Sequence, residues 1–111
     1  MKLESNKYLY DIKTAADKLG RFIQGKNLLE YQSDDLLKSA VERQFEIIGE
    51  ALNQLIKSNP DMRESFPDAR EIIAFRNLLI HGYAEVDDQL VWNIAETRLP
   101  RLLEKVNTLL K

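Results

Sequence analysis

The stretch DDLLKSAVERQFEIIGEALNQLIKS, residues 34–58, is the longest part of the chain in which apolar residues follow a helical period. Apolar side chains recur every three or four residues, which is typical of a helix that buries one face. Ser33 or Asp34 is placed to cap its first turn. The stretch predicts a helix over about Asp34 to Ser58. Among the apolar residues that it carries are Leu37, Ala40, Val41, Ile47, Ile48, Ala51, Leu52, Leu55 and Ile56.

The same period extends over most of the remaining chain, and no stretch shows the strict alternation of a half-buried strand. It predicts a first helix over about Lys7 to Ile23, joined to the longest helix by a polar link at Lys26 to Ser33. A third helix is expected over about Asp68 to His81 and a last one over about Asp87 to Leu110. Pro100 should kink the last helix or divide it into two pieces. We therefore expect an all-α protein, an antiparallel up-and-down four-helix bundle.

The composition indicates an ordinary globular protein. With 111 residues, of which 44% are hydrophobic and 31% charged, the chain fits one domain over residues 1–111. It contains no cysteine and one histidine, His81. Thiolate nucleophiles, cysteine-ligated metals and two-histidine metal sites within one chain are excluded. We expect no cofactor and no metal, and only dimerisation would bring a second imidazole near His81.

The net charge is −2 and the isoelectric point about 5.4, which argues against a basic clamp for nucleic acid. Contact with RNA would have to be local. No signal peptide opens the chain, and no apolar run approaches the roughly 18 residues of a membrane span. We expect a cytoplasmic protein with no membrane contact. The aromatic residues lie too far apart in sequence to indicate a stacking surface for RNA, and packing explains each better. They are Tyr8, Tyr10, Tyr31 and Trp92.

An arginine interrupts the apolar pattern of the third helix. Arg76 falls in the middle of an apolar stripe, where a charge is unusual. Phe75 and Leu78 form a second apolar strip, so we expect the helix to be covered by its own bundle and by another subunit. Gly49, deep inside the longest helix, costs about 1 kcal/mol relative to alanine, which indicates that something packs close against it. The stripe around Arg76 comprises Ile72, Ile73, Leu79 and Ile80.

Two interpretations of Arg76 stay open at this point. A buried guanidinium needs an acceptor, and an ion pair with Glu46 or Glu50 would supply one. Alternatively, Arg76 is held to grip a phosphate, which it can bind bidentately. Glu46 and Glu50 lie one turn apart, as in a carboxylate metal site. We reject that site because the bundle di-iron pattern needs a glutamate three residues before a histidine, and Leu78 stands there before His81.

His81 also has two interpretations. In the last turn of a helix it is favourably placed at the negative end of the dipole, and the same location would help it donate a proton near neutral pH. Asn77 lies one turn before His81 and is placed to hydrogen-bond with it. Arg76 and His81 are five residues apart, about 140° around an ideal helix, so one straight helix does not aim both at one point.

Three blocks of sequence resemble the HepT-like branch of the HEPN superfamily. The string RNLLIHGY, Arg76 to Tyr83, matches the RxxxxHxY motif of that branch. FEIIGEA, residues 45–51, is similar to its second-helix signature. VDDQLVWNI, residues 86–94, followed by LP at residues 99–100, is similar to the segment after the motif. Together the blocks cover most of the chain from Tyr31 onward, in the expected order.

The resemblance implies a fold and an activity. HEPN proteins are helical bundles that form homodimers in which two motifs face each other across a cleft, and members with the full motif are metal-independent ribonucleases. Carried onto this chain, Arg76 would hold the scissile phosphate of an RNA. His81 would be the general acid or base. Asn77 would orient the site.

The resemblance also implies a partner. HepT-like ribonucleases act as toxins of toxin-antitoxin systems, neutralised by a cognate minimal nucleotidyltransferase antitoxin that transfers AMP to the motif tyrosine, here Tyr83. The added negative charge should repel RNA from the cleft. The alternative is a non-catalytic helical dimer that binds the nucleotidyltransferase and serves as its substrate, which would need Tyr83 but neither Arg76 nor His81 as a chemical group.

Overall fold

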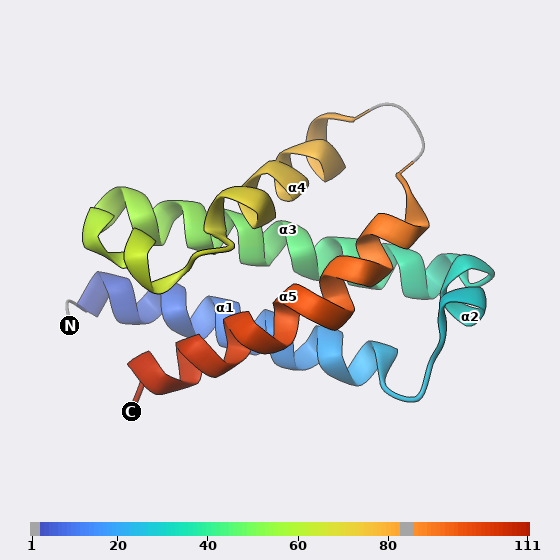
Figure 1. Cartoon of the computed structure of the whole chain (residues 1–111), viewed down its shortest axis with the longest axis horizontal. Coiled ribbons are helices and arrows are strands. Elements are labelled where there is room, and N and C mark those ends of the chain that lie inside the picture. The colour runs from blue at the N-terminus through green and yellow to red at the C-terminus, as the bar shows by residue number, and fades with distance from the viewer. Residues whose placement is uncertain (1–2, 83–85) are drawn as a thin grey trace.

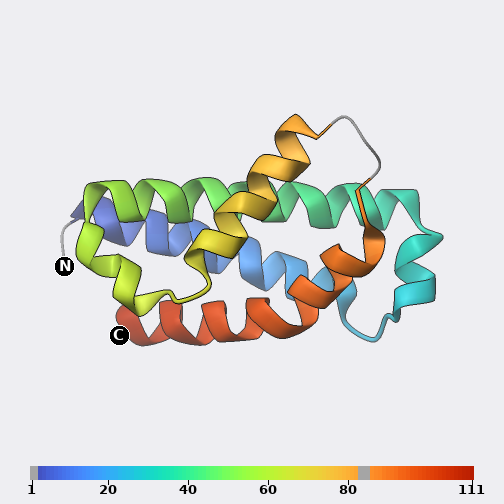
Figure 2. The same ribbon diagram turned by 45° about the horizontal axis from the view of Figure 1, so that its top comes forward.

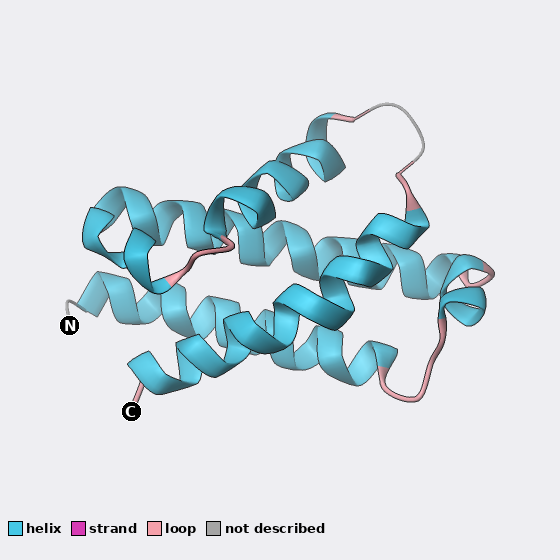
Figure 3. Ribbon diagram, in the orientation of Figure 1, coloured by secondary structure: helices cyan, strands magenta, loops and turns pink. Residues whose placement is uncertain are grey.

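The computed structural model describes residues 3–82 and 86–111, and all regular secondary structure in these two ranges is helical (Figure 3). The all-α prediction is confirmed. The elements, which Figure 1 shows in order along the chain, are α1 (Leu3–Ile23), α2 (Leu28–Gln32), α3 (Asp35–Ser58), the 3₁₀ helix η1 (Pro60–Ser65), α4 (Ala69–His81) and α5 (Asp88–Leu109).

The four long helices match their predicted ranges closely. Asp34 caps α3, because its side chain accepts a hydrogen bond of 3.0 Å from the backbone N–H of Leu37. Asp87 caps α5 in the same way through the N–H groups of Gln89 and Leu90. The largest shift is in α1, which begins at Leu3, one turn before the predicted start.

The short helix α2 was not predicted, since residues 26–33 were expected to form a polar link. Asn27 and Glu30 form a reciprocal capping box: the Asn27 side chain accepts from the Glu30 N–H, and the Glu30 carboxylate accepts from the Asn27 N–H. Tyr31, fully buried, fixes the turn to the core. Asparagine followed by glutamate three residues later is the signal that would have revealed this helix.

The long helices form an antiparallel up-and-down arrangement. Helices α1 and α3 lie side by side along the longest dimension of the molecule, with α5 packed on α1 and α4 on α3 (Figure 1). Helix α4 crosses α3 at a steep angle (Figure 2). As expected for four helices of alternating direction, α1 begins at the same end of the bundle at which α5 finishes.

The buried face of α4 differs from the predicted stripe. Ala69, Ile72 and Phe75 are buried, and the Phe75 ring packs edge-on against Phe45 of α3 at 5.2 Å between centroids. Ile80, which was placed on the same stripe as Ile72, is 41% exposed. Ile73 and Leu79 of that stripe are partly buried against the core, so the predicted stripe is confirmed for these two and for Ile72 and is wrong for Ile80.

Helix α4 packs chiefly against α3. Two ion pairs connect its start to α5, Glu71 with Arg98 at 3.1 Å and Asp68 with Arg101 at 2.9 Å. Leu78, expected under a second covered strip, is 47% exposed. Within one chain Phe75 of this strip is covered by α3 and Leu78 is not, and burial of Leu78 by another subunit stays a prediction.

Helix α5 continues through Pro100 as one helix, so the predicted division into two pieces does not occur. The missing N–H of Pro100 removes one helical hydrogen bond. Leu99 and Leu102 are buried on either side of it and hold both parts of the helix to the core. A kink at Pro100 stays a prediction. No helix in the described ranges is long and apolar enough to cross a membrane.

Candidate active site

Arg76 lies where α4 crosses α3, and a glycine makes that crossing possible. Gly49 is buried in α3, and a Cβ atom placed on it would overlap the Cβ of Arg76 and lie 2.6 Å from its Cγ. The prediction that something packs close against Gly49 is confirmed, and the neighbour is the stem of Arg76. The glycine lets the arginine pass directly over the α3 backbone.

The Arg76 guanidinium is held by two acceptors. Its Nη2 lies 2.5 Å from Oε2 of Glu50, and its Nη1 donates to Oδ1 of Asn77 at 2.9 Å. Of the two carboxylates left open by the sequence, Glu50 is therefore the partner of Arg76. Glu46 instead lies 3.8 Å from Arg43, one turn before it on α3. The ion-pair interpretation of Arg76 is confirmed, and its phosphate-binding role remains a proposal.

The guanidinium faces an open groove of about 400 Å³ between α1, α3 and α4. The Arg76 side chain is 21% exposed. Arginine carries five N–H donors, and each Nη nitrogen uses one of its two on the acceptors above, so one on each is left over. The groove therefore presents an immobilised cation with spare donors. Its other lining residues are Lys7, Tyr8, Asp11, Arg43, Glu46, Ile47, Glu50, Ala51, Gln54 and Ile80.

His81 is separated from this groove. It is the last residue of α4, its side chain is exposed, and it does not line the groove that holds Arg76. The Asn77 oxygen accepts from Arg76, and the structure shows no hydrogen bond between Asn77 and His81. As the 140° separation predicts, one chain does not bring Arg76 and His81 to one point.

Comparison with known proteins agrees with the sequence resemblance. The model of the family described as "Ribonuclease HepT-like" matches residues 12–109 of the chain. This range includes Gly49, Arg76 and His81. The chain belongs to the HepT-like family.

Two HepT-like relatives match over nearly their whole length. The chain is 35% identical over 101 residues to the protein named "Putative RNase MJ1380" of Methanocaldococcus jannaschii. The matched region covers 89% of this chain and 90% of that protein. It is 31% identical over 111 residues to "Probable ribonuclease HepT" of Thermococcus cleftensis, which covers all of both chains. No solved structure matches the chain.

The motif tyrosine of this HepT-like chain, Tyr83, lies outside the described residues, so its predicted modification is a matter for proposal. The described chain resumes at Val86. Asp87 then caps α5, and Asp88 lies 3.2 Å from Lys38 of α3, so these two aspartates have structural partners. These contacts fix the start of α5 against α3.

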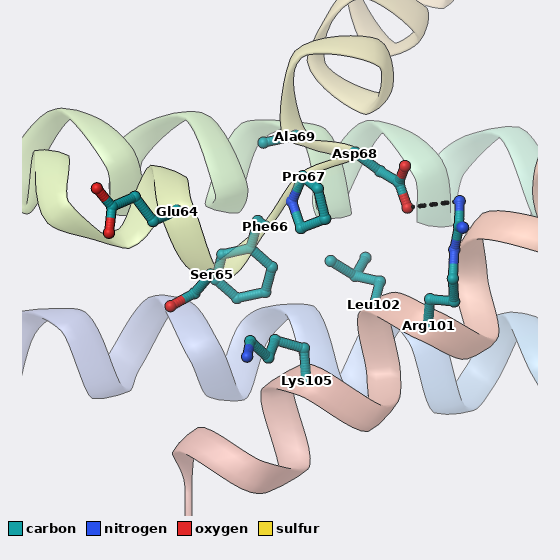
Figure 4. A pocket seen from close by; sticks show the side chains of 9 residues that line it. All are labelled: Glu64, Ser65, Phe66, Pro67, Asp68, Ala69, Arg101, Leu102 and Lys105. Carbon is teal, nitrogen blue, oxygen red and sulfur yellow. Dashed lines mark ion pairs between the residues drawn. The ribbon is translucent and has the colours of Figure 1, made fainter.

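A second hollow, of about 350 Å³, lies between the start of α4 and α5 (Figure 4). Phe66 and Leu102 contribute apolar surface, and the ion pair of Asp68 with Arg101 closes one side. None of the motif residues that the structure describes, Arg76 to Gly82, lines it. The predicted catalytic groups therefore belong to the groove and to the end of α4, not to this hollow.

Two aromatic residues that are far apart in sequence meet in the core. The rings of Tyr31 and Trp92 lie 5.4 Å apart between centroids, and both are buried. Burial raises the pKa of the Tyr31 hydroxyl, and the nearby Glu42 and Asp88 raise it further. Burial, followed by repulsion from Asp88, also raises the pKa of Glu42. Packing is thus the role of Tyr31 and Trp92, as predicted, and neither ring is available to RNA.

The close contact between Gly49 and Arg76 can be tested with two glycine-to-alanine substitutions that should change the stability of the protein in opposite directions. Gly49→Ala should lower the free energy of unfolding by about 1–2 kcal/mol, because overpacking against Arg76 outweighs the better helix propensity of alanine. Gly20→Ala in α1 is the matched control: a Cβ there meets nothing within 4 Å, so stability should rise by about 0.5–1 kcal/mol. Urea denaturation measures both. A Gly49→Ala protein at least as stable as the wild type would contradict the close crossing.

Proposed function

We propose that this HepT-like chain is a metal-independent endoribonuclease in which Arg76 and His81 are the catalytic residues. The observation that carries the proposal is the arrangement of Arg76, held by Glu50 and Asn77 in an open groove with two Nη donors to spare. An arginine fixed in this way is prepared for a phosphate, because little side-chain entropy remains to be lost on binding. The names of the two relatives, both RNases, support RNA as the source of that phosphate.

The reaction follows from the two side chains. The RNA 2′-hydroxyl loses its proton and attacks the adjacent phosphorus, and the bond from phosphorus to the 5′-oxygen of the next nucleotide breaks. One proton leaves the 2′-hydroxyl and one is delivered to the departing 5′-oxygen, and His81 acts as the general acid or base in these proton transfers. Arg76 stabilises the charge that develops on the phosphate oxygens, and Asn77 orients its guanidinium. The products are a 2′,3′-cyclic phosphate and a 5′-hydroxyl, and the protons balance without a metal.

A complete site requires two copies of the chain in this proposal, since His81 lies away from the groove of its own Arg76. The exposed side chains of Leu78 and Ile80, on the part of α4 between these two residues, support a homodimer formed through this helix. A two-fold axis would place the His81 of one copy opposite the Arg76 of the other.

The activity is tested on a labelled single-stranded RNA of mixed sequence in buffer containing a chelator. Cleavage should persist with the chelator present and yield ends with a 2′,3′-cyclic phosphate. An oligonucleotide with a 2′-deoxy sugar at each cleaved position is the control, and it should stay intact because its nucleophile is missing. Cleavage of this control, or dependence on an added divalent metal, would overturn the mechanism.

We also propose that the chain is the toxin of a toxin-antitoxin pair, acting in the cytoplasm on RNA, and that a minimal nucleotidyltransferase neutralises it by transferring AMP to Tyr83. A phosphodiester added next to the motif brings negative charge that repels the RNA backbone. Incubation with a cognate minimal nucleotidyltransferase and ATP should add mass in steps of AMP and abolish cleavage. Adducts that persist in Tyr83→Phe would rule out Tyr83 as the sole acceptor.

A further inference from the structure

The Glu50 carboxylate binds Arg76 through one oxygen and accepts a hydrogen bond from a second side chain through the other oxygen. Gln54, one turn further along α3, donates from Nε2 to Oε1 of Glu50 at 3.0 Å, while Oε2 of Glu50 pairs with Arg76. Arg76 in turn donates to Asn77. Four side chains from two helices therefore form one continuous series of hydrogen bonds that begins at Gln54.

The Glu50 side chain needs this support. It is 46% exposed, and a glutamate with that freedom loses entropy whenever it is fixed in an ion pair, so exposed pairs are weak by themselves. The Gln54 amide, half-buried in the wall of the groove, restricts Glu50 to the rotamer in which Oε2 faces Arg76. The amide is also neutral. A lysine at this position would compete with Arg76 for the carboxylate, whereas glutamine orients the carboxylate and leaves its charge to the arginine.

We propose that Gln54 is a positioning residue of the active site: it fixes Glu50 and, through Glu50, aims the spare Nη donors of Arg76 into the groove where the phosphate binds. This inference rests on the proposed ribonuclease function. Gln54 forms its side-chain hydrogen bond with Glu50 and not with Arg76, so the proposed effect on Arg76 passes through Glu50.

The test compares Gln54→Met, which keeps the length of the side chain and removes the amide, with Asn53→Leu, which removes an amide from the neighbouring half-buried position of α3. Cleavage of labelled single-stranded RNA by the full chain gives kcat and KM. Gln54→Met should lower kcat about five- to tenfold with KM changed less than about twofold, since a small misplacement of a catalytic group acts mainly on the transition state. Asn53→Leu should leave both constants as in the wild type.

A double-mutant cycle separates positioning from a general structural role. In a Glu50→Ala background, Gln54→Met should have no further effect on kcat, because the residue through which it acts is gone. Additive losses, or a normal kcat in Gln54→Met alone, would overturn the inference while leaving the ribonuclease proposal intact. Absence of RNA cleavage by the wild-type chain would overturn both.

Discussion

His81→Ala is expected to lower the rate of RNA cleavage by about 10²- to 10⁴-fold, the usual contribution of a general acid or base. The side chain is exposed at the last residue of α4. Its removal should therefore change the unfolding free energy by no more than the roughly 0.3–1 kcal/mol of a favourable charge at a helix end. A large loss of activity at nearly constant stability identifies a chemical role.

The control for this substitution is Asn107→Ala, which removes an exposed polar side chain from α5. It should cleave RNA as fast as the wild type, and urea denaturation should find all three proteins folded. Equal cleavage by the wild type and His81→Ala, with both folded, would contradict the catalytic assignment. The chain would then fit the non-catalytic alternative, a helical dimer that serves as the substrate of a nucleotidyltransferase.

A mixture of two inactive variants is expected to regain activity if each site is built from two copies. Arg76→Met keeps the aliphatic stem that packs over Gly49 and removes the guanidinium, while His81→Ala removes the imidazole. In a mixed dimer one site has both substitutions and the other has neither. Random exchange makes half of the dimers mixed, so the mixture should reach roughly a quarter of wild-type activity from two nearly inactive proteins.

The control is a mixture of either variant with the double variant Arg76→Met/His81→Ala, in which no intact site forms. Native mass spectrometry establishes that the copies have exchanged. Full exchange without any recovery would mean that Arg76 and His81 of the same chain work together, for instance after the end of α4 unwinds. Recovery in the control mixture would exclude a shared site of the kind proposed.

The sequence predicts well whatever depends on local spacing. The helical period of residues 34–58 predicts the bounds of α3 to within one residue. The aspartates before α3 and α5 act as caps because their short side chains accept hydrogen bonds from backbone N–H groups of the first helical turn. The cost of Gly49 in a helix indicates a close neighbour. The motif names Arg76 and His81, and their five-residue spacing already excludes convergence within one straight helix.

Contacts between helices could not be predicted in the same way. The rotation of α4 about its own axis depends on how Phe75 meets Phe45, and the choice of Glu50 over Glu46 depends on where α4 crosses α3. Gln54 carries no signal of its own in the sequence, since a glutamine on a helix surface is ordinary. It gains a role only when Glu50, one turn away, is seen to hold Arg76.

The crossing of Arg76 over Gly49 also limits how the chain can evolve. Replacing a helical glycine by alanine is among the commonest ways to stabilise a protein, and mutations of this kind accumulate readily under selection for stability. At Gly49 that route is closed, because the added methyl group would push against the residue proposed to bind the phosphate. Lineages that need a more stable bundle must find it elsewhere, for example at Gly20, and position 49 should retain glycine wherever the arginine is still used.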